Sequence, residues 1–123
     1  MKKLFFYLLP FAFCFVLSCH KEGPGGKATI KGTVKHHSIS IPNALVYIKY
    51  GATESPGSNV TYYDASANAD ANANYEFNDL RKGNYYLFAV GFDSSIVKTV
   101  TGGVPTEIKS KTETVEMNVP VTE

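Results

Sequence analysis

Residues 74–89, with the sequence NYEFNDLRKGNYYLFA, decide the fold of this chain. Apolar side chains recur at every second position on both sides of a central turn, and this period is typical of β-strands with one buried face. Gly83 supplies the turn, because glycine adopts a positive φ at little cost. The side chains that we expect in the core are Tyr75, Phe77, Leu80, Tyr85, Leu87 and Ala89.

Shorter segments with the same alternation lie before and after this stretch. The segments expected to be strands are 29–35, 44–50, 60–65, 74–77, 85–92, 96–101 and 112–121. Residues 36–43 and 51–59 are interpreted as loops, residues 102–105 as a break, and the alanine-rich residues 65–73 as a loop or a loosely held hairpin tip. No window shows a helical period. The sequence therefore predicts an all-β protein, a seven-stranded antiparallel β-sandwich.

The N-terminus has the layout of a secretory signal peptide. Lys2 and Lys3 precede an apolar run over residues 4–17, and Ser18 and Cys19 follow it. A small residue before cysteine resembles the bacterial lipobox, which implies acylation of Cys19 and cleavage before it. The alternative is an uncleaved transmembrane anchor. That alternative is disfavoured because the run is shorter than the ~20 residues of a spanning helix and contains a proline.

Cleavage before Cys19 would leave 105 residues, enough for one domain with a core. We predict three parts: a signal peptide over 1–18, a flexible lipid-anchored tether over 19–27, and a β-sandwich domain over 28–121. The part after the signal has ten basic and eleven acidic residues, and this balance argues against a nucleic-acid partner. Its one cysteine is the lipid acceptor, so no disulfide is expected.

The order of the segments 30–34, 42–46, 70–77 and 80–89 resembles the carboxypeptidase regulatory-like domain, a family common in Bacteroidetes-type bacteria. The resemblance covers about residues 28–121. It implies a transthyretin-like (prealbumin-like) Greek-key sandwich without catalytic activity of its own. One departure is Ala73, where the family usually has glycine, and this difference suggests a remodelled turn.

Few motifs in the chain could form a catalytic or metal-binding site. Asp70, Asn72 and Asn74 imitate the start of an EF-hand, but the glycine and the final glutamate of that loop are missing, so only a looser Ca²⁺ site stays open. His36 and His37 are interpreted as exposed loop histidines and not as a metal site, because neighbouring residues of a strand point apart. We expect no cofactor, no metal site and no enzymatic activity.

The outward side of the strongest strand is unusually apolar. If Tyr85 and Leu87 face the core, the opposite face carries Tyr86, Phe88, Val90 and Phe92. Four apolar side chains exceed what one solvent-facing strand usually exposes, so they form a candidate partner-binding face. The alternative is that another strand or loop covers them.

The sequence thus predicts a lipid-anchored module on the bacterial outer membrane, with a binding or structural accessory role in nutrient uptake or adhesion. Its expected partners are the membrane, through the lipid, and an envelope protein; the oligomeric state and the membrane face stay open. The alternative is a transthyretin-like or peptidase-associated accessory with weak hydrolase activity. The inference from the expected fold to a binding or accessory role rests on analogy with other proteins of that fold.

Overall fold

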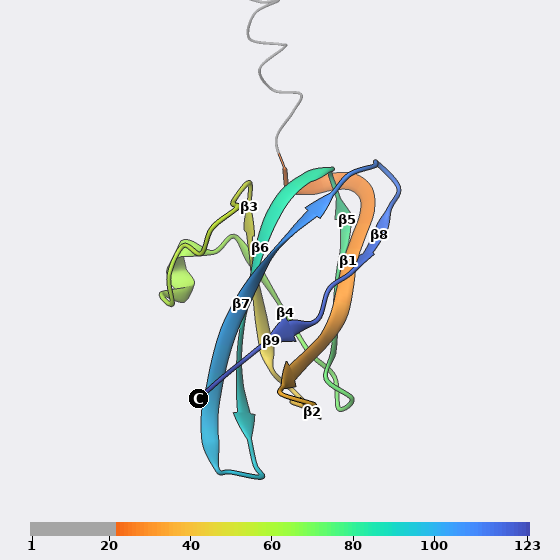
Figure 1. Ribbon diagram of the computed structural model, residues 1–123. Helices are drawn as coiled ribbons and strands as arrows, with labels where there is room; N and C mark the ends of the chain where they lie inside the picture. Colours follow the sequence, from red (N-terminus) through yellow and green to blue (C-terminus); the bar gives the residue numbers. More distant parts are fainter. Residues whose placement is uncertain (1–21) are drawn as a thin grey trace, which may run out of the picture.

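In the computed structural model, which describes residues 22–123, two β-sheets pack face to face around one core (Figure 1). The first sheet contains β1 (Pro24–His36), β2 (Ile39–Ser40), β5 (Asn74–Leu80), β8 (Thr114–Glu116) and β9 (Val119–Pro120). The second sheet contains, in spatial order, β4 (Ala65–Asn68), β3 (Leu45–Tyr50), β6 (Gly83–Asp93) and β7 (Lys98–Ile108). The predicted all-β fold in two sheets is confirmed.

The first sheet is mixed and not purely antiparallel. Its central strand β1 pairs antiparallel with β2 and β5 but parallel with β8 and β9. The expected strand over 112–121 is divided into β8 and β9, and between them the side chain of Asn118 accepts a hydrogen bond from the Thr33 N–H at 3.0 Å. Residues 22–123 consequently form nine strands instead of seven. The Greek-key topology stays a prediction.

The predicted core faces are confirmed. Tyr75, Phe77 and Leu80 are buried on β5 or at its end, and Tyr85, Leu87 and Ala89 are buried on β6. Burial of aromatic and aliphatic side chains from both sheets provides the main stabilising term in such a small domain. The other strands and the C-terminal segment add Ile30, Val34, Val46, Ile48, Val100, Ile108, Val119 and Val121.

Two expected interruptions are regular strands. Residues 65–68 form the edge strand β4, paired with β3, although alanine and asparagine are poor strand formers. Residues 102–105 lie inside β7. Gly102 lets the C-terminal segment approach closely, since a Cβ there would lie 2.1 Å from the Pro120 carbonyl oxygen. Conversely, the first half of the strand expected over 60–65 is the 3₁₀ turn η1 (Val60–Tyr62), and only residue 65 of that segment belongs to a strand.

Residues 24–27, which we expected to belong to a flexible tether, are part of β1, which begins at Pro24. Pro24 and Ala28 both pair with Leu80, so the residues between them form an irregularity in the strand. Gly26 permits this close contact, since a Cβ there would lie 2.1 Å from the Leu80 carbonyl oxygen. Gly26 therefore allows close packing of the chain at this position.

Ala73 occupies the conformation that a glycine would favour. Its φ is +67°, and its carbonyl oxygen accepts a hydrogen bond from the Val34 N–H at 3.0 Å. The turn before it is stabilised by Asp70, whose carboxylate accepts from the N–H groups of Asn72 and Asn74. The left-handed backbone at this position is one that glycine would adopt at lower cost. Ala73 adopts this left-handed conformation at an energetic cost, because its Cβ is crowded there.

The Tyr85 hydroxyl joins the start of β1 to the turn between β5 and β6. It donates to the Arg81 carbonyl oxygen at 2.5 Å and accepts from the Gly23 N–H at 2.9 Å. The Tyr85 ring is fully buried and meets Tyr50 edge to face, with ring centroids 6.0 Å apart. A buried hydroxyl needs partners, and here both partners are backbone groups at the same end of the sandwich.

We predict that Tyr85→Phe destabilises the protein by about 1–3 kcal/mol, because it leaves the Gly23 N–H and the Arg81 carbonyl without their partner. Urea unfolding measures the change. The control is Tyr62→Phe, on a side chain that is 56 % exposed, which should change stability by less than about 0.5 kcal/mol. Equal stability of Tyr85→Phe and the wild type would contradict this role of the hydroxyl.

The predicted signal peptide and Cys19 lie outside the described residues. Among residues 22–123, no helix is long and apolar enough to cross a membrane.

Candidate functional site

The predicted partner-binding face is largely covered. Phe88 is only 7 % exposed, because Tyr63 stacks on it with ring centroids 5.6 Å apart. Tyr86 and Val90 are half-buried, and only Phe92, at 52 %, is well exposed. The expectation of four exposed side chains is therefore wrong for Phe88. The covering segment is the connection between β3 and β4.

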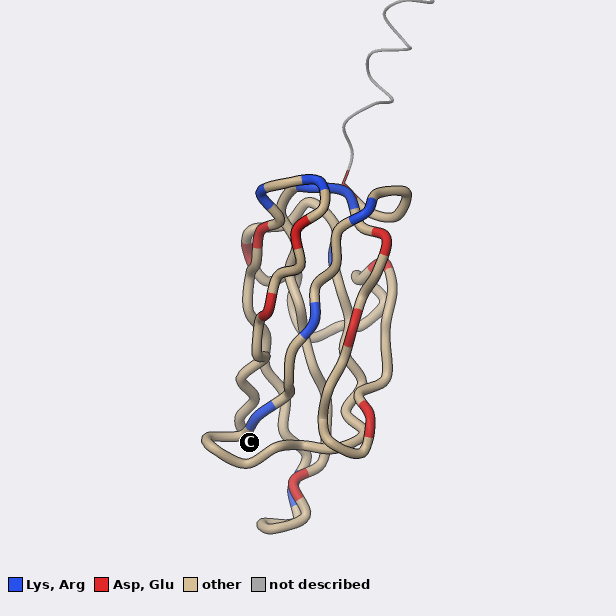
Figure 2. The backbone as a smooth tube through the Cα atoms, turned by 90° about the vertical axis from the view of Figure 1, so that its right-hand side faces the viewer, with Lys and Arg blue, Asp and Glu red and all other residues tan. Residues whose placement is uncertain are grey.

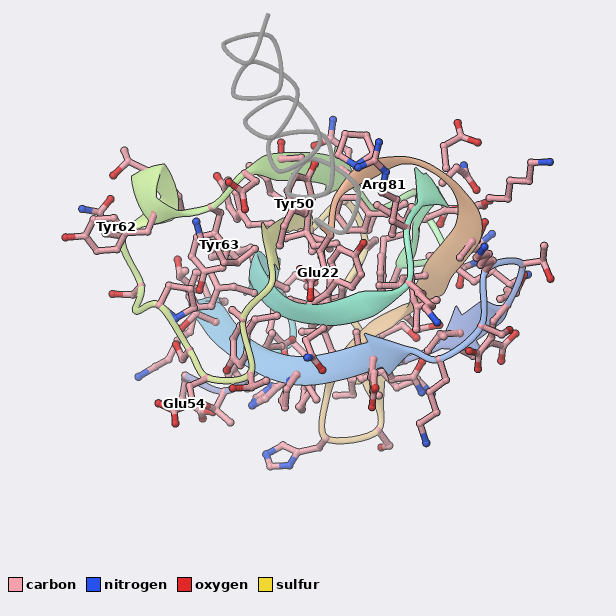
Figure 3. The ribbon with its side chains drawn as sticks, turned by 90° about the horizontal axis from the view of Figure 1, so that it is seen from above. Glu22, Tyr50, Glu54, Tyr62, Tyr63 and Arg81 are labelled. Atoms are coloured by element: carbon pink, nitrogen blue, oxygen red, sulfur yellow. The ribbon has the colours of Figure 1, made fainter. Side chains whose placement is uncertain are left out.

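The chain positions Tyr63 through a short network in that connection. The Tyr63 hydroxyl donates to the Gly57 carbonyl oxygen at 2.8 Å, and the Asn59 side chain caps η1 by accepting from the Thr61 N–H. Figure 3 shows the two neighbouring tyrosines apart, with Tyr62 at the outer edge and Tyr63 turned toward the sheet. The same outer surface includes Tyr47, whose ring centroid lies 5.9 Å from that of Tyr63.

An ionic cluster around a buried histidine lies at the other end of the sandwich from Tyr85. His36, the last residue of β1, is 3 % exposed and contacts a carboxylate with each ring nitrogen. Its Nδ1 lies 2.7 Å from Oδ2 of Asp93, which ends β6, and its Nε2 lies 2.8 Å from Oε1 of Glu123. The interpretation of His36 as an exposed loop residue is wrong, because β1 extends to include it.

The C-terminal segment brings Glu123 to this cluster. After β9, which pairs with β1 in the first sheet, Thr122 forms two backbone hydrogen bonds with Thr101 of β7 in the second sheet, at 2.8 and 2.9 Å. The chain thus crosses from one sheet to the other just before Glu123. The cluster joins the end of β1, the end of β6 and this crossing segment.

The two carboxylates and the imidazole stabilise each other's charged forms. The hydrogen bond with Asp93, and then that with Glu123, raise the pKa of His36 above its ordinary value. Hydrogen bonds from Ser95 and His36 lower the pKa of Asp93 to about 2. Its own backbone N–H and His36 lower the pKa of Glu123. The cluster thus favours the ionised form of the two carboxylates and the protonated form of the imidazole.

The cluster does not have the contacts of a Ser–His–Asp triad. The Ser95 hydroxyl donates to Oδ1 of Asp93 at 2.6 Å and not to the imidazole. The imidazole nitrogen that would activate a serine faces Glu123 instead. These residues are therefore arranged to hold His36 in place and not to activate Ser95.

The same residues include a group that could bind a metal ion. His36, His37 and Glu123 can each present one ligand atom, and these atoms lie within 4.8 Å of one another. The Ca²⁺-like loop is less suited, because Asp70 uses its Oδ1 to accept from two backbone N–H groups of its own turn. His36 and Asp93 could have been found from the sequence by extending the period of two from Val34 to His36 and from Ala89 to Asp93.

Similarity to known proteins is found at the level of the fold. No protein-family model matches the chain, and no curated protein matches it. A DUF3823 family protein from Parabacteroides merdae has a similar structure, with a TM-score of 0.50, 14 % identity, and coverage of 80 % of this chain and 47 % of that chain. The major pilin subunit of Bacillus cereus has a TM-score of 0.52, 13 % identity, and coverage of 79 % of this chain and 30 % of that chain. The chain therefore corresponds to less than half of either protein.

We predict that Phe88→Ala lowers the free energy of unfolding by about 3–5 kcal/mol, because it removes a buried ring and leaves Tyr63 without its stacking partner. The matched variant on the same strand and face is Phe92→Ala, which should cost less than about 0.5 kcal/mol. Urea unfolding compares the two. Similar losses for both would show that the outer face is uniformly exposed or uniformly buried.

We also predict that the stability of the wild type falls as the pH rises from about 6 to about 9 in buffer with a metal chelator. Because the folded-state pKa of His36 is raised, its contribution is fully present below the unfolded-state pKa and is lost as the pH rises through the folded-state value. His36→Gln should remove this slope in urea midpoints measured across the range. A wild-type midpoint that increases with pH would contradict the ionic cluster.

Proposed function

We propose that this chain is a lipid-anchored module of the bacterial cell envelope, with a binding or structural accessory role and no catalytic step of its own. The lipid would be attached at Cys19, and the β-sandwich would stand on the outer membrane. The main observation in support of this proposal is that the predicted lipid acceptor, Cys19, lies only a few residues before the first strand, which begins at Pro24.

That distance limits how far the domain can move from the membrane. Four residues lie between Cys19 and Pro24, and the five steps from one Cα to the next reach at most about 17 Å when the chain is fully extended. The Gly23 carbonyl accepts a hydrogen bond from the Arg81 N–H, so the start of β1 is fixed to the turn between β5 and β6. An anchor at Cys19 would therefore hold this end of the sandwich next to the membrane.

The charges on the described residues support this orientation. Lys and Arg gather at the end of the sandwich where β1 begins (Figure 2). Arg81 and Lys82 lie in the turn between β5 and β6, and Lys109 and Lys111 lie between β7 and β8, beside the pairing of Gly83 with Ile108. Basic side chains next to a membrane interact favourably with anionic lipid headgroups, by about 1 kcal/mol each.

Apolar side chains are exposed at the opposite end. Phe92, Ile96 and Val97 lie in or beside the turn between β6 and β7, and Ile39 lies on the hairpin formed by β1 and β2. A domain held by its basic end would present these side chains away from the membrane, where a partner protein of the envelope could contact them. The accessory role is also compatible with the fold, which a pilin subunit shares.

We predict that Cys19→Ser leaves an unprocessed precursor, because diacylglycerol transfer requires the thiol. The wild type should fractionate with membranes, and intact mass spectrometry should show an acylated N-terminus at Cys19. An unmodified mature N-terminus at any other residue would contradict the lipid anchor. The matched control is Cys14→Ser, which should be processed normally because Cys14 lies inside the apolar run.

A further inference from the structure

We propose that His36, His37 and Glu123 bind a divalent transition-metal ion such as Zn²⁺, with Asp93 orienting His36. The inference does not depend on the lipid anchor. It rests on the ligand atoms that the fold brings together at the end of β1.

The three side chains come from two separate parts of the chain. His36 ends β1 and His37 is the next residue, and their rings lie 4.4 Å apart between centroids with an interplanar angle of 38°. Glu123 arrives with the C-terminal segment after it crosses between the sheets. All three ligand atoms lie within 4.8 Å of one another, so small movements of the exposed His37 and Glu123 side chains suffice to place an ion between them.

Asp93 gives His36 the arrangement of a metal-binding histidine. Metal-bound imidazoles usually donate their second ring N–H to a carboxylate, which fixes the tautomer and the orientation of the ring. Here Nδ1 of His36 lies 2.7 Å from buried Asp93, and Ser95 holds that carboxylate through its hydroxyl and its backbone N–H. Nε2 is therefore directed at Glu123, where an ion would take the place of the shared proton.

The ligand types select the class of metal. Two imidazoles and one carboxylate suit Zn²⁺ and its neighbours, whereas Ca²⁺ and Mg²⁺ prefer oxygen ligands alone. The carboxylates of Asp93 and Glu123 also balance the two positive charges of the ion. With three protein ligands, one coordination position stays open, as in zinc sites that accept water or a further ligand.

An open groove lies beside the site, on the side of His37. His37 borders an open groove of about 450 Å³ whose other lining residues include Lys35, Asn118, Pro120 and Thr122. The backbone at His37 has a φ of +58°, which places its side chain at a tight turn between β1 and β2. The exposed histidine thus provides the accessible ligand, and the buried His36 provides the fixed one.

The test is isothermal titration of the purified full chain, in detergent, with Zn²⁺, and with Ca²⁺ and Mg²⁺ as comparisons. We expect one saturable Zn²⁺ site per chain and no saturable site for the other two ions. His37→Asn and Glu123→Gln should each lose saturable binding. Asparagine tolerates positive φ, so His37→Asn should keep the wild-type urea midpoint in chelator. Glu123→Gln can still accept a hydrogen bond from His36 but loses the carboxylate charge, so it should stay folded with a lower urea midpoint than the wild type.

Two results would overturn the proposal. One is the absence of saturable Zn²⁺ binding by the folded wild type. The other is unchanged binding in His37→Asn and Glu123→Gln together with loss of binding in His20→Asn, which would place the ion at the histidine next to Cys19. As a second readout, Zn²⁺ should raise the urea midpoint of the wild type, because an ion that binds only the folded state stabilises it, and should not raise that of His37→Asn.

Discussion

The position of the first strand depends on one buried hydroxyl group. Tyr85 lies in the centre of the core, and its hydroxyl holds the backbone at Gly23 and at Arg81 together. Burying this group without partners would be costly, so the start of β1 must return to the turn between β5 and β6. That return fixes the end of the sandwich at which the chain arrives, and with it the orientation of any anchor attached a few residues earlier.

The two ends of the sandwich are held by different chemistry. The Tyr85 end uses hydrogen bonds between a neutral phenol and the backbone, which do not change near neutral pH. The His36 end uses charges, and its histidine has a pKa raised by the neighbouring carboxylates. In a domain without an expected disulfide, this cluster joins both sheets to the C-terminal segment. It is therefore the part of the described domain that we expect to respond to pH and propose to bind a metal ion.

The sequence predicts the core faces well because one physical rule, the period of two, determines them. Tyr75, Phe77, Tyr85 and Leu87 are buried as expected, and the alternating segment of the neighbouring strand β3 likewise buries Val46 and Ile48. Each of these positions lies within an alternating segment, where a change of register would move all of its apolar side chains into solvent.

The errors occur where tertiary contacts override local preference. The edge strand β4 consists of poor strand formers and depends on its pairing with β3. β7 runs through two glycines because neighbouring chain segments approach them closely. The candidate site was missed for a related reason. His36 and Asp93 occupy positions on the buried faces of β1 and β6 where an apolar side chain would be expected. Their burial is tolerated because the two side chains form a hydrogen bond with each other. Because His36 and Asp93 are 57 positions apart, no local sequence pattern indicates that the two side chains pair.

The orientation of the domain on the membrane tests the account most directly. Fluorescent labels can be attached at Ser110→Cys, beside the basic end, and at Ser94→Cys, beyond the far end of β6, in the lipidated protein on vesicles with an acceptor dye in the bilayer. The eleven residues of β6 span about 35 Å, so the label at position 110 should show strong energy transfer and the label at 94 much weaker transfer. Equal transfer at the two positions, or stronger transfer from position 94, would contradict an anchor at the Tyr85 end.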